Sequence, residues 1–231
     1  MWFAVSNVLD RERIDRAAEL LRLAKFVDGR ATITGSADPH AKNNLEMEVS
    51  EPYLKLVDML DRAVDASHEI GGRLLPRART TPIINRYDTG MSFAEHVDGP
   101  IQGGQTQFGR APGRFGQNFL RTDFSMTLFL TYPQHYDGGE LELREDEQVQ
   151  LVKLPAGSAV CYQTGTRHSV RPVTRGSRVC AVYWFQSLVQ DARLLRAIWE
   201  LDCVARRLRQ TADGSELQTI KANFIRCLAQ V

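Results

Sequence analysis

Short β-rich runs fill the stretch from about Arg79 to Leu188, and Gly, Pro, Asp and Asn residues separate them. The runs read TPIINRY, FSMTLFLTY, GELELRE, VQLVKLP, SAVCYQT and VCAVYWFQS. No helical period interrupts them, and many short strands in succession are typical of a sandwich or barrel. This stretch therefore predicts a β core over residues 79–189.

Helices are predicted before this β core. Asp10 suits a helix N-cap, and Ser50, followed by Pro52, suits the start of a second helix that would end at Gly71-Gly72. The apolar stripes of the two helices are Ile14, Ala17, Leu20 and Leu21, and then Leu54, Val57, Leu60 and Val64. Between the two helices, the sequence FVDGRAT is predicted to form a turn. We expect residues 1–78 to form a helical and mixed support region.

The helical period returns after Gln190. One stripe consists of Leu194, Leu195, Ile198, Leu201, Val204 and Leu208, and a second, after a break at TADGS, consists of Leu217, Ile220, Phe224 and Leu228. Residues 190–231 are therefore expected to form a helical extension. The stripes indicate helix packing, which fits contacts within one chain and also a homodimer through the terminal helices.

Composition narrows the class of protein. The 29 basic residues nearly balance the 28 acidic ones, so net charge gives no reason to expect a nucleic acid or an anionic membrane as partner. No stretch approaches the roughly 18 apolar residues of a membrane span, and the apolar run in MWFAVSNVLDRER is too short for a signal peptide. The four cysteines form no C-x-x-C pair, which predicts free thiols. We expect a cytoplasmic protein.

His96 and Asp98 lie two residues apart in the stretch RYDTGMSFAEHVDG, just after a predicted strand. On a strand, residues i and i+2 point to the same face, roughly 6.5 Å apart, so both side chains can reach one ion. With a second histidine they would make the two-histidine, one-carboxylate arrangement that suits non-haem Fe(II) and leaves one face of the metal open. An H-x-D tripeptide taken alone is more often a solvated polar pair.

The other four histidines differ in their sequence context. His40 lies in a polar stretch, and His68 is expected late in a helix, where interaction with the helix C-terminus explains it. His135 falls in a turn-rich connection, so we expect it near the rim of a site rather than on a metal. His168 differs from these three, because it begins a β run and Arg178 follows it by ten residues.

Arg178 follows His168 by ten residues and lies inside the apolar run SRVCAVYWF. Arginine is rarely buried without a partner, and its planar guanidinium is the side chain best shaped to hold a carboxylate through two hydrogen bonds. The alternatives are an arginine on an edge strand in water, or one that pairs with Glu140 or Glu142.

Five sequence blocks, taken in order, resemble a known family. They are Tyr87, Gly90, His96 and Asp98 in the pattern Y-x-x-G-x-x-x-x-x-H-x-D, followed by TLFL, GGEL, PAGSAV and HSVRPVTRGSR. The set resembles the Fe(II)- and 2-oxoglutarate-dependent oxygenases of the prolyl 4-hydroxylase type, and more narrowly the bacterial PKHD-type hydroxylases. KFVDGRATITGSADPHAKNNLEM and WFQSLVQDARLLRAIWELD are similar to that subgroup too, so the resemblance covers nearly the whole chain.

The resemblance implies an α+β fold whose core is a double-stranded β-helix, or jelly roll, with helices at both ends of the chain. It implies that His96, Asp98 and His168 hold Fe(II) inside the barrel, and that Arg178 pairs with the distal carboxylate of 2-oxoglutarate. Tyr87 matches a tyrosine that lines the 2-oxoglutarate pocket in similar enzymes, although a core tyrosine is the alternative. Animal collagen-type relatives usually carry lysine at the position of Arg178, which argues against collagen-like substrates.

The activity that the resemblance implies is hydroxylation with O2, in which 2-oxoglutarate is converted to succinate and CO2. The substrate would be a prolyl or other peptidyl residue, some bacterial relatives are connected with iron uptake, and an L-ascorbate requirement like that of related enzymes is expected. The competing hypothesis is a jelly-roll protein that binds a metal as a sensor or stabilising ion without catalysis. Such a protein has no need of Arg178.

A long polar stretch runs from Gly99 to Arg121, directly after the H-x-D tripeptide. It is rich in Gly, Gln and Arg and has no apolar period, and a long loop beside a site is often a lid or a substrate clamp. Arg110, Arg114 and Arg121 would then favour an anionic substrate. The alternative is a solvated loop without a role in binding.

Overall fold

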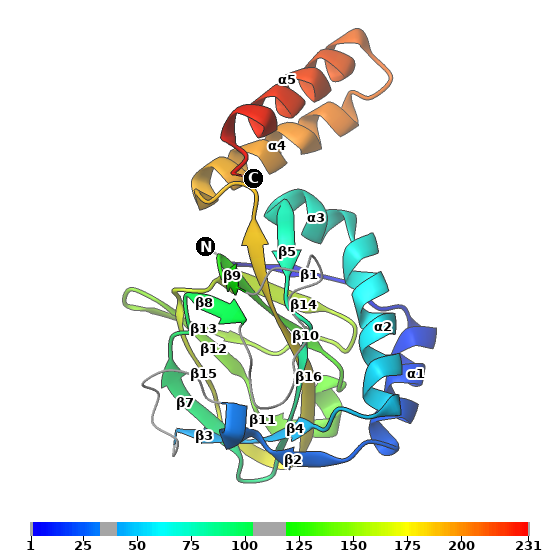
Figure 1. Ribbon diagram of the computed structural model, residues 1–231, viewed down its shortest axis with the longest axis vertical. Helices are drawn as coiled ribbons and strands as arrows, with labels where there is room; N and C mark the ends of the chain where they lie inside the picture. The colour runs from blue at the N-terminus through cyan, green and yellow to red at the C-terminus, as the bar shows by residue number, and fades with distance from the viewer. Residues whose placement is uncertain (1, 33–40, 104–118, 231) are drawn as a thin grey trace.

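Two antiparallel sheets form the core of the protein, whose computed structural model describes residues 2–32, 41–103 and 119–230 (Figure 1). The larger sheet contains β1 (Trp2–Val5), β2 (Phe26–Asp28), β4 (Leu45–Met47), β5 (Pro76–Arg79), β6 (Ile83–Asp88), β10 (Phe124–Phe129), β11 (Tyr136–Gly138), β14 (Ala159–Gln163) and β16 (Val173–Ser187). The smaller sheet contains β3 (Lys42–Asn43), β7 (Ser92–His96), β12 (Leu141–Glu145), β13 (Gln148–Val152) and β15 (Arg167–Val170).

The strand order is β1-β14-β10-β16-β6-β4-β2 in the larger sheet and β13-β12-β15-β7-β3 in the smaller sheet. β11 and β5 pair with the two ends of the long strand β16. Each run predicted as a strand is present, as β6, β10, β12, β13, β14 and β16. The predicted jelly roll with flanking helices is therefore confirmed.

Alternation along β16 separates the two sides of the larger sheet. Arg178 contacts the rings of Tyr87 and Phe129, which belong to the apolar cluster between the two sheets. Val179 and Ala181 belong instead to the cluster beneath the helices. Because successive side chains on a strand point to opposite faces, one strand supplies both the interior of the barrel and its outer, helix-covered surface.

Three helices cover the outer face of the larger sheet, namely α1 (Arg11–Arg22), α2 (Glu51–Ala66) and α3 (His68–Leu74) (Figure 1). Asp10 caps α1 as predicted, because its carboxylate accepts a hydrogen bond of 2.9 Å from the backbone N–H of Arg13. Ile14, Ala17 and Leu20 are buried against the sheet. Because the helices cover its outer face, the larger sheet carries apolar side chains on both faces.

The second predicted helix is in fact two helices. Ser50 precedes α2 with Pro52 in the first turn, but its side chain makes no capping bond, and Leu54 is exposed although it was predicted to face inward. The break falls at Ser67, whose hydroxyl caps α3, so His68 begins a helix rather than ending one. Gly71-Gly72 lie within α3, where a Cβ on Gly72 would come within 2.4 Å of the Trp199 ring of the next helical segment. Close packing, and not helix termination, explains this glycine.

The N-terminal region contributes strands that the sequence pattern did not indicate. FVDGRAT was predicted to form a turn, yet it forms β2 followed by the 3-10 helix η1 (Gly29–Thr32). β3 and β4 follow the residues outside the described ranges. Strands of two or three residues are too short to show a period of two, which is why this prediction was wrong.

The C-terminal helices α4 (Ala192–Arg207) and α5 (Ala212–Leu228) form a hairpin that projects from one end of the sheets (Figure 1). Thr211 caps α5, so most of TADGS lies inside that helix rather than in a break. Leu194, Leu208, Ile220 and Phe224, four residues of the predicted stripes, are exposed. A homodimer through these helices stays a prediction. In the described parts of the chain, no helix is long and apolar enough to cross a membrane.

Candidate metal centre

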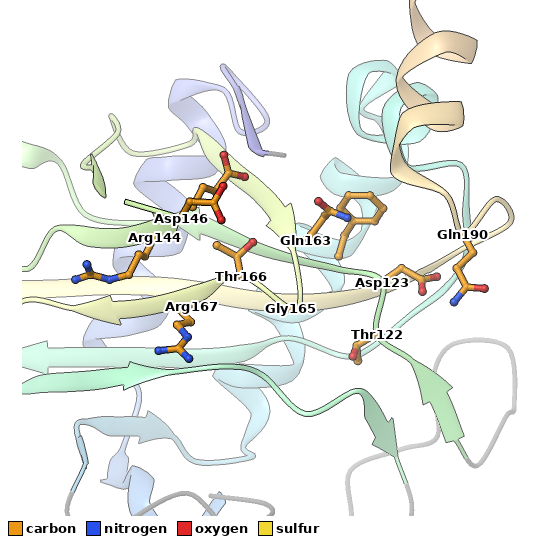
Figure 2. Close-up of a pocket in the computed structure, with 11 residues that line it drawn as sticks. Thr122, Asp123, Arg144, Asp146, Gln163, Gly165, Thr166, Arg167 and Gln190 are labelled. Atoms are coloured by element: carbon orange, nitrogen blue, oxygen red, sulfur yellow. The ribbon is translucent and has the colours of Figure 1, made fainter. Parts of the chain in front are cut away.

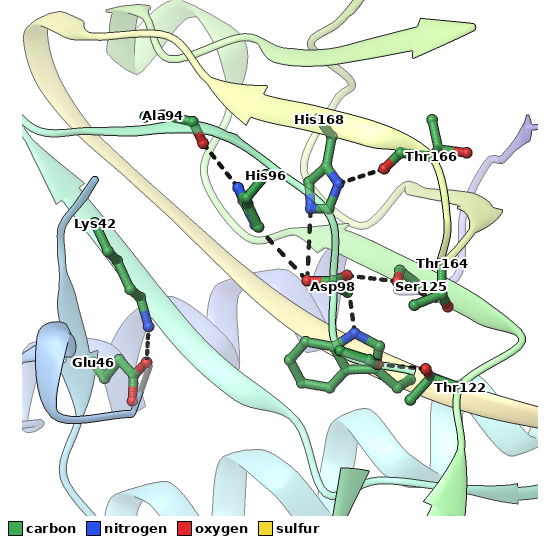
Figure 3. A network of polar contacts seen from close by, with 12 residues as sticks. Lys42, Glu46, Ala94, His96, Asp98, Thr122, Ser125, Thr164, Thr166 and His168 are labelled. Atoms are coloured by element: carbon green, nitrogen blue, oxygen red, sulfur yellow. Dashed lines mark hydrogen bonds and ion pairs between the residues drawn. The ribbon is translucent and has the colours of Figure 1, made fainter. Parts of the chain in front are cut away.

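His96, Asp98 and His168 meet between the two sheets (Figure 3). His96 ends β7 and lies opposite His168 of the neighbouring strand β15, while Asp98 follows two residues after β7. The Nε2 atoms of His96 and His168 lie 3.8 and 3.7 Å from Asp98 Oδ1, and the three candidate ligand atoms lie within 4.8 Å of one another. All three side chains are mostly buried. H-x-D is therefore not a solvated pair in this protein.

Backbone carbonyls fix the orientation of both imidazole rings. His96 Nδ1 lies 2.8 Å from the carbonyl oxygen of Ala94, and His168 Nδ1 lies 2.9 Å from that of Thr166. A carbonyl oxygen can only accept, so each Nδ1 must carry the hydrogen. In this tautomer Nε2 is the nitrogen that can donate a lone pair to a metal, and both Nε2 atoms lie on the side of Asp98.

Two donors hold the carboxylate of Asp98. Ser125 Oγ donates to Asp98 Oδ2 at 2.7 Å, and Trp184 Nε1 donates to the same oxygen at 2.9 Å (Figure 3). Both residues come from the larger sheet, on β10 and β16. Because Oδ2 is engaged, Oδ1 is the carboxylate oxygen that faces the two histidines, and such supporting bonds orient metal ligands in known sites.

Burial and charge set the protonation state of His96. Burial first, and repulsion from the neighbouring His168 second, lower the pKa of His96 to about 4. The ring also stacks on Phe93, with 3.7 Å between the ring centroids. At neutral pH, His96 is thus a neutral ring that is ready to donate a lone pair.

The depressed pKa of His96 predicts how the stability of the metal-free protein depends on pH. Between its usual value of 6.5 and about 4, the unfolded chain binds a proton at this residue and the folded chain does not. The free energy of unfolding is therefore expected to fall as pH falls through this window. Chemical denaturation at several pH values measures this slope, which should be shallower in His96→Gln. Equal slopes in the two proteins would contradict the lowered pKa of His96.

Arg178 is buried in the barrel, at 1% exposure, and no acidic side chain among the described residues pairs with it. Its Nη1 contacts Cys180 Sγ at 3.1 Å, and its guanidinium lies 5.2 Å from the Tyr87 ring centroid, but its Nε has no hydrogen-bond partner within residues 2–32, 41–103 and 119–230. Arg178 is therefore not an arginine in water, and it pairs with neither Glu140 nor Glu142. Glu142 pairs instead with Arg144 and Arg171.

Two tyrosines surround this arginine. Tyr87, on β6, lies opposite Arg178 in the strand register and is buried, which raises its pKa. Tyr136 is fully buried beside Arg178, its hydroxyl makes no well-formed hydrogen bond among the residues that the structure describes, and burial raises its pKa to about 12. Tyr136 was not predicted because it follows a turn, although its place beside GGEL was a usable signal. Gly139 leaves room here, since a Cβ would lie 3.1 Å from Arg178 Cδ.

The other histidines lie away from the cluster or outside the described residues. His135 is exposed in the 3-10 helix η2 (Pro133–His135) and contacts Tyr132. His68 lies 3.2 Å from Arg206 on the C-terminal hairpin. His40 falls outside the described residues.

Only the ends of the Gly99 to Arg121 stretch are described. They form a two-stranded sheet, β8 (Ile101–Gly103) with β9 (Phe119–Arg121), whereas Arg110 and Arg114 fall outside the described residues. Arg121 pairs with Asp123 at 2.7 Å and also donates to the carbonyl of Ser187. Arg121 thus stabilises the base of this stretch, which argues against its predicted role toward an anionic substrate.

A polar pocket of about 800 Å³ lies where β12, β15 and the segment before β10 come together (Figure 2). Its lining includes Thr166, whose carbonyl holds His168, and Phe124, the residue before Ser125. Arg144 and Arg167, which also line it, both pair with Glu95. Arg144 and Arg167 are neighbours of Leu143 and His168 on their strands, so by alternation their side chains lie on the face of the smaller sheet opposite the ligand cluster.

Known proteins are similar to this chain in sequence and in fold. Residues 82–186 match the 2OG-Fe(II) oxygenase superfamily. A PKHD-type hydroxylase of Gluconacetobacter diazotrophicus is 37% identical over 98% of this chain and 95% of its own, and one of Paracoccus denitrificans is 39% identical over 90% and 88%. The chain therefore belongs to the PKHD-type hydroxylases, a group of 2-oxoglutarate- and Fe(II)-dependent oxygenases.

Solved structures support the fold. A prolyl hydroxylase from Trichoplax adhaerens, in complex with a peptide fragment of hypoxia inducible factor, has a TM-score of 0.58 and 15% identity, over 80% of this chain and 83% of that one. The viral collagen prolyl hydroxylase of Paramecium Bursaria Chlorella virus-1, in a 2OG complex, has a TM-score of 0.51 and 14% identity, over 80% and 96%. At such identities the likeness shows the fold alone. The family itself uses Fe(II), 2-oxoglutarate and O2.

Proposed function

We propose that His96, Asp98 and His168 hold Fe(II) in this hydroxylase, and that Arg178 binds the distal carboxylate of 2-oxoglutarate. The observation that carries the proposal is the buried guanidinium of Arg178, whose Nε has no hydrogen-bond partner in the described part of the chain. A buried unpaired charge is costly, and a carboxylate would both neutralise it and accept its hydrogen bond.

The donor set fits the metal. Two imidazole nitrogens and one carboxylate oxygen on one side of an ion are the arrangement typical of non-haem Fe(II) oxygenases, and they leave positions open for the cosubstrate and O2. The hydrogen bonds to Ala94, Thr166, Ser125 and Trp184 keep these three donors convergent. When bound, Fe(II) supplies the oxidising chemistry with O2, and 2-oxoglutarate leaves as succinate and CO2.

The surroundings of Arg178 support its role toward the cosubstrate. The hydroxyl of Tyr136 lies close to Arg178 but makes no well-formed hydrogen bond within the described residues, and its raised pKa keeps it protonated, so we assign to it a second hydrogen bond to the carboxylate. Tyr87 lies with its ring beside the guanidinium, where it shapes the site and excludes water. Together these residues would bind and orient the five-carbon dicarboxylate.

For the substrate we propose a peptidyl residue, with prolyl as the first candidate. The support is the family membership, because this family implies a peptide or protein substrate. A link to iron uptake, an ascorbate requirement and a cytoplasmic location stay predictions from the sequence.

Purified protein tests the catalytic proposal against a non-catalytic metal-binding jelly roll. Anaerobic addition of Fe(II) and 2-oxoglutarate together is expected to give a visible absorbance that neither gives alone. In air, the same mixture with ascorbate should form succinate slowly without added substrate. Metal binding without either signal would favour the sensor hypothesis.

The same reaction can reveal the substrate class. Whole-cell protein is added, digested and searched for peptides that are heavier by one oxygen atom, and a reaction without 2-oxoglutarate is the control. Prolyl or other side chains that gain oxygen only in the complete reaction would support a peptidyl substrate. A gain found only among small metabolites would contradict it.

A further inference from the structure

A buried ion pair lies beside the candidate metal centre, and the proposed chemistry does not use it. Lys42 Nζ lies 2.6 Å from Glu46 Oε1, and each side chain is only 7% exposed (Figure 3). Lys42 belongs to β3 of the smaller sheet and Glu46 to β4 of the larger sheet. The pair therefore joins the two sheets across the barrel, next to His96.

The residues opposite this pair connect it to a candidate ligand. Lys42 lies opposite Phe93 in the register of β3 and β7, and its ammonium lies 5.8 Å from the Phe93 ring centroid. The Phe93 ring stacks on the His96 imidazole at 3.7 Å, with 16° between the planes. The Lys42 ammonium, the Phe93 ring and the His96 imidazole are thus arranged in a row that ends at the candidate ligands.

Stability alone is a weak reason for such a pair. Removing two charges from water costs several kcal/mol, and apolar side chains of similar volume often replace a buried ion pair without loss of stability. The hydrogen bond that orients His96 goes to Ala94, two residues earlier on the same strand. This bond does not connect the imidazole to a second strand. An ion pair on β3 and β4 that holds Phe93 against the imidazole would add this second connection.

We propose that Lys42 and Glu46 are positioning residues for His96. Glu46 holds the ammonium of Lys42 against Phe93, and Phe93 keeps the imidazole plane at the angle that aims Nε2 at the metal. The inference rests on the proposed role of His96 as a ligand. It gives the short strands β3 and β4 a function in the reaction that is separate from closing the barrel.

Cobalt(II) binding to the metal-free full-length protein, measured by calorimetry, tests the proposal. In Lys42→Met/Glu46→Met the affinity is expected to fall about tenfold, the lower range for residues that support metal ligands. The pair is neutral overall, so its removal leaves the local charge unchanged, and the unfolding midpoint of the metal-free variant should stay near that of the wild type. Lys42→Arg, which keeps a cation beside Phe93, should bind almost as the wild type does.

Lys221→Met is the matched control, because it breaks another partly buried ion pair, with Asp202, in the C-terminal hairpin far from the site. Its cobalt affinity should be unchanged. If the double variant does not fold, Phe93→Leu decides, since it removes the stack but keeps an apolar side chain. Wild-type affinity in Phe93→Leu, or in a folded double variant, would overturn the positioning role. Equal cobalt binding by the wild type and His96→Gln would instead refute the ligand assignment itself.

Discussion

Replacing Asp98 by alanine is expected to reduce succinate formation by more than about 1000-fold, the largest effect of any single substitution in this chain. The carboxylate is the one anionic donor of the cluster, and a bound metal contributes several kcal/mol to transition-state stabilisation, with about 1.4 kcal/mol for each tenfold in rate. The measurement is uncoupled succinate formation at saturating 2-oxoglutarate and Fe(II).

A graded comparison separates loss of the metal from loss of the fold. Trp184→Phe removes one of the two hydrogen bonds to Asp98 and should weaken metal binding by roughly 10–100-fold, with activity restored by added Fe(II). Asp58→Ala, which breaks an exposed pair with Arg62 on α2, should behave as the wild type does. Full activity in Asp98→Ala would remove Asp98 from the ligand set.

Arg178→Met is expected to raise the KM for 2-oxoglutarate by roughly 100-fold or more, because loss of a buried charge-assisted pair costs about 3–5 kcal/mol. The turnover number at saturation should change much less, since the metal ligands are intact. Methionine fills similar space between Tyr87 and Phe129, so the metal-free variant should be no less stable than the wild type. Steady-state kinetics over a range of 2-oxoglutarate concentrations measures the KM and the turnover number separately.

A second buried arginine provides the control for this prediction. Arg79 is engaged by Asp61 and Asp65, so Arg79→Met should lower the free energy of unfolding and leave the KM for 2-oxoglutarate unchanged. Arg178 shows the opposite balance, because none of the acidic side chains that the structure describes pairs with it. An unchanged KM in Arg178→Met would mean that this arginine is structural.

Part of the candidate site was predictable from simple strand rules, because His96 and Asp98 share a face by their spacing. His168 was expected as a ligand from the family resemblance, and the structure places it opposite His96 on the paired strands β7 and β15. Arg178 was conspicuous as a charge inside an apolar run. The many short β runs predicted a sandwich or barrel, and the resemblance narrowed this prediction to a jelly roll.

Other parts of the fold and site were not predictable, for physical reasons. Lys42 and Glu46 lie on strands too short to show alternation, so their burial depends on tertiary packing alone. The kink between α2 and α3 depends on the capping bond of Ser67, which competes with a continuous helix. Trp184, in contrast, could have been predicted to face the site, because the period of two places it on the same face of β16 as Val182 and Arg178.

The long strand β16 has a further consequence for how the site works. It carries Trp184, which holds the carboxylate of Asp98, and Arg178, six residues earlier and on the same face. Strand pairing on both sides fixes this spacing. In the cosubstrate site that we propose, the distance between the guanidinium and the metal ligands would therefore suit one chain length. We expect a shorter or longer dicarboxylate to bind more weakly than 2-oxoglutarate.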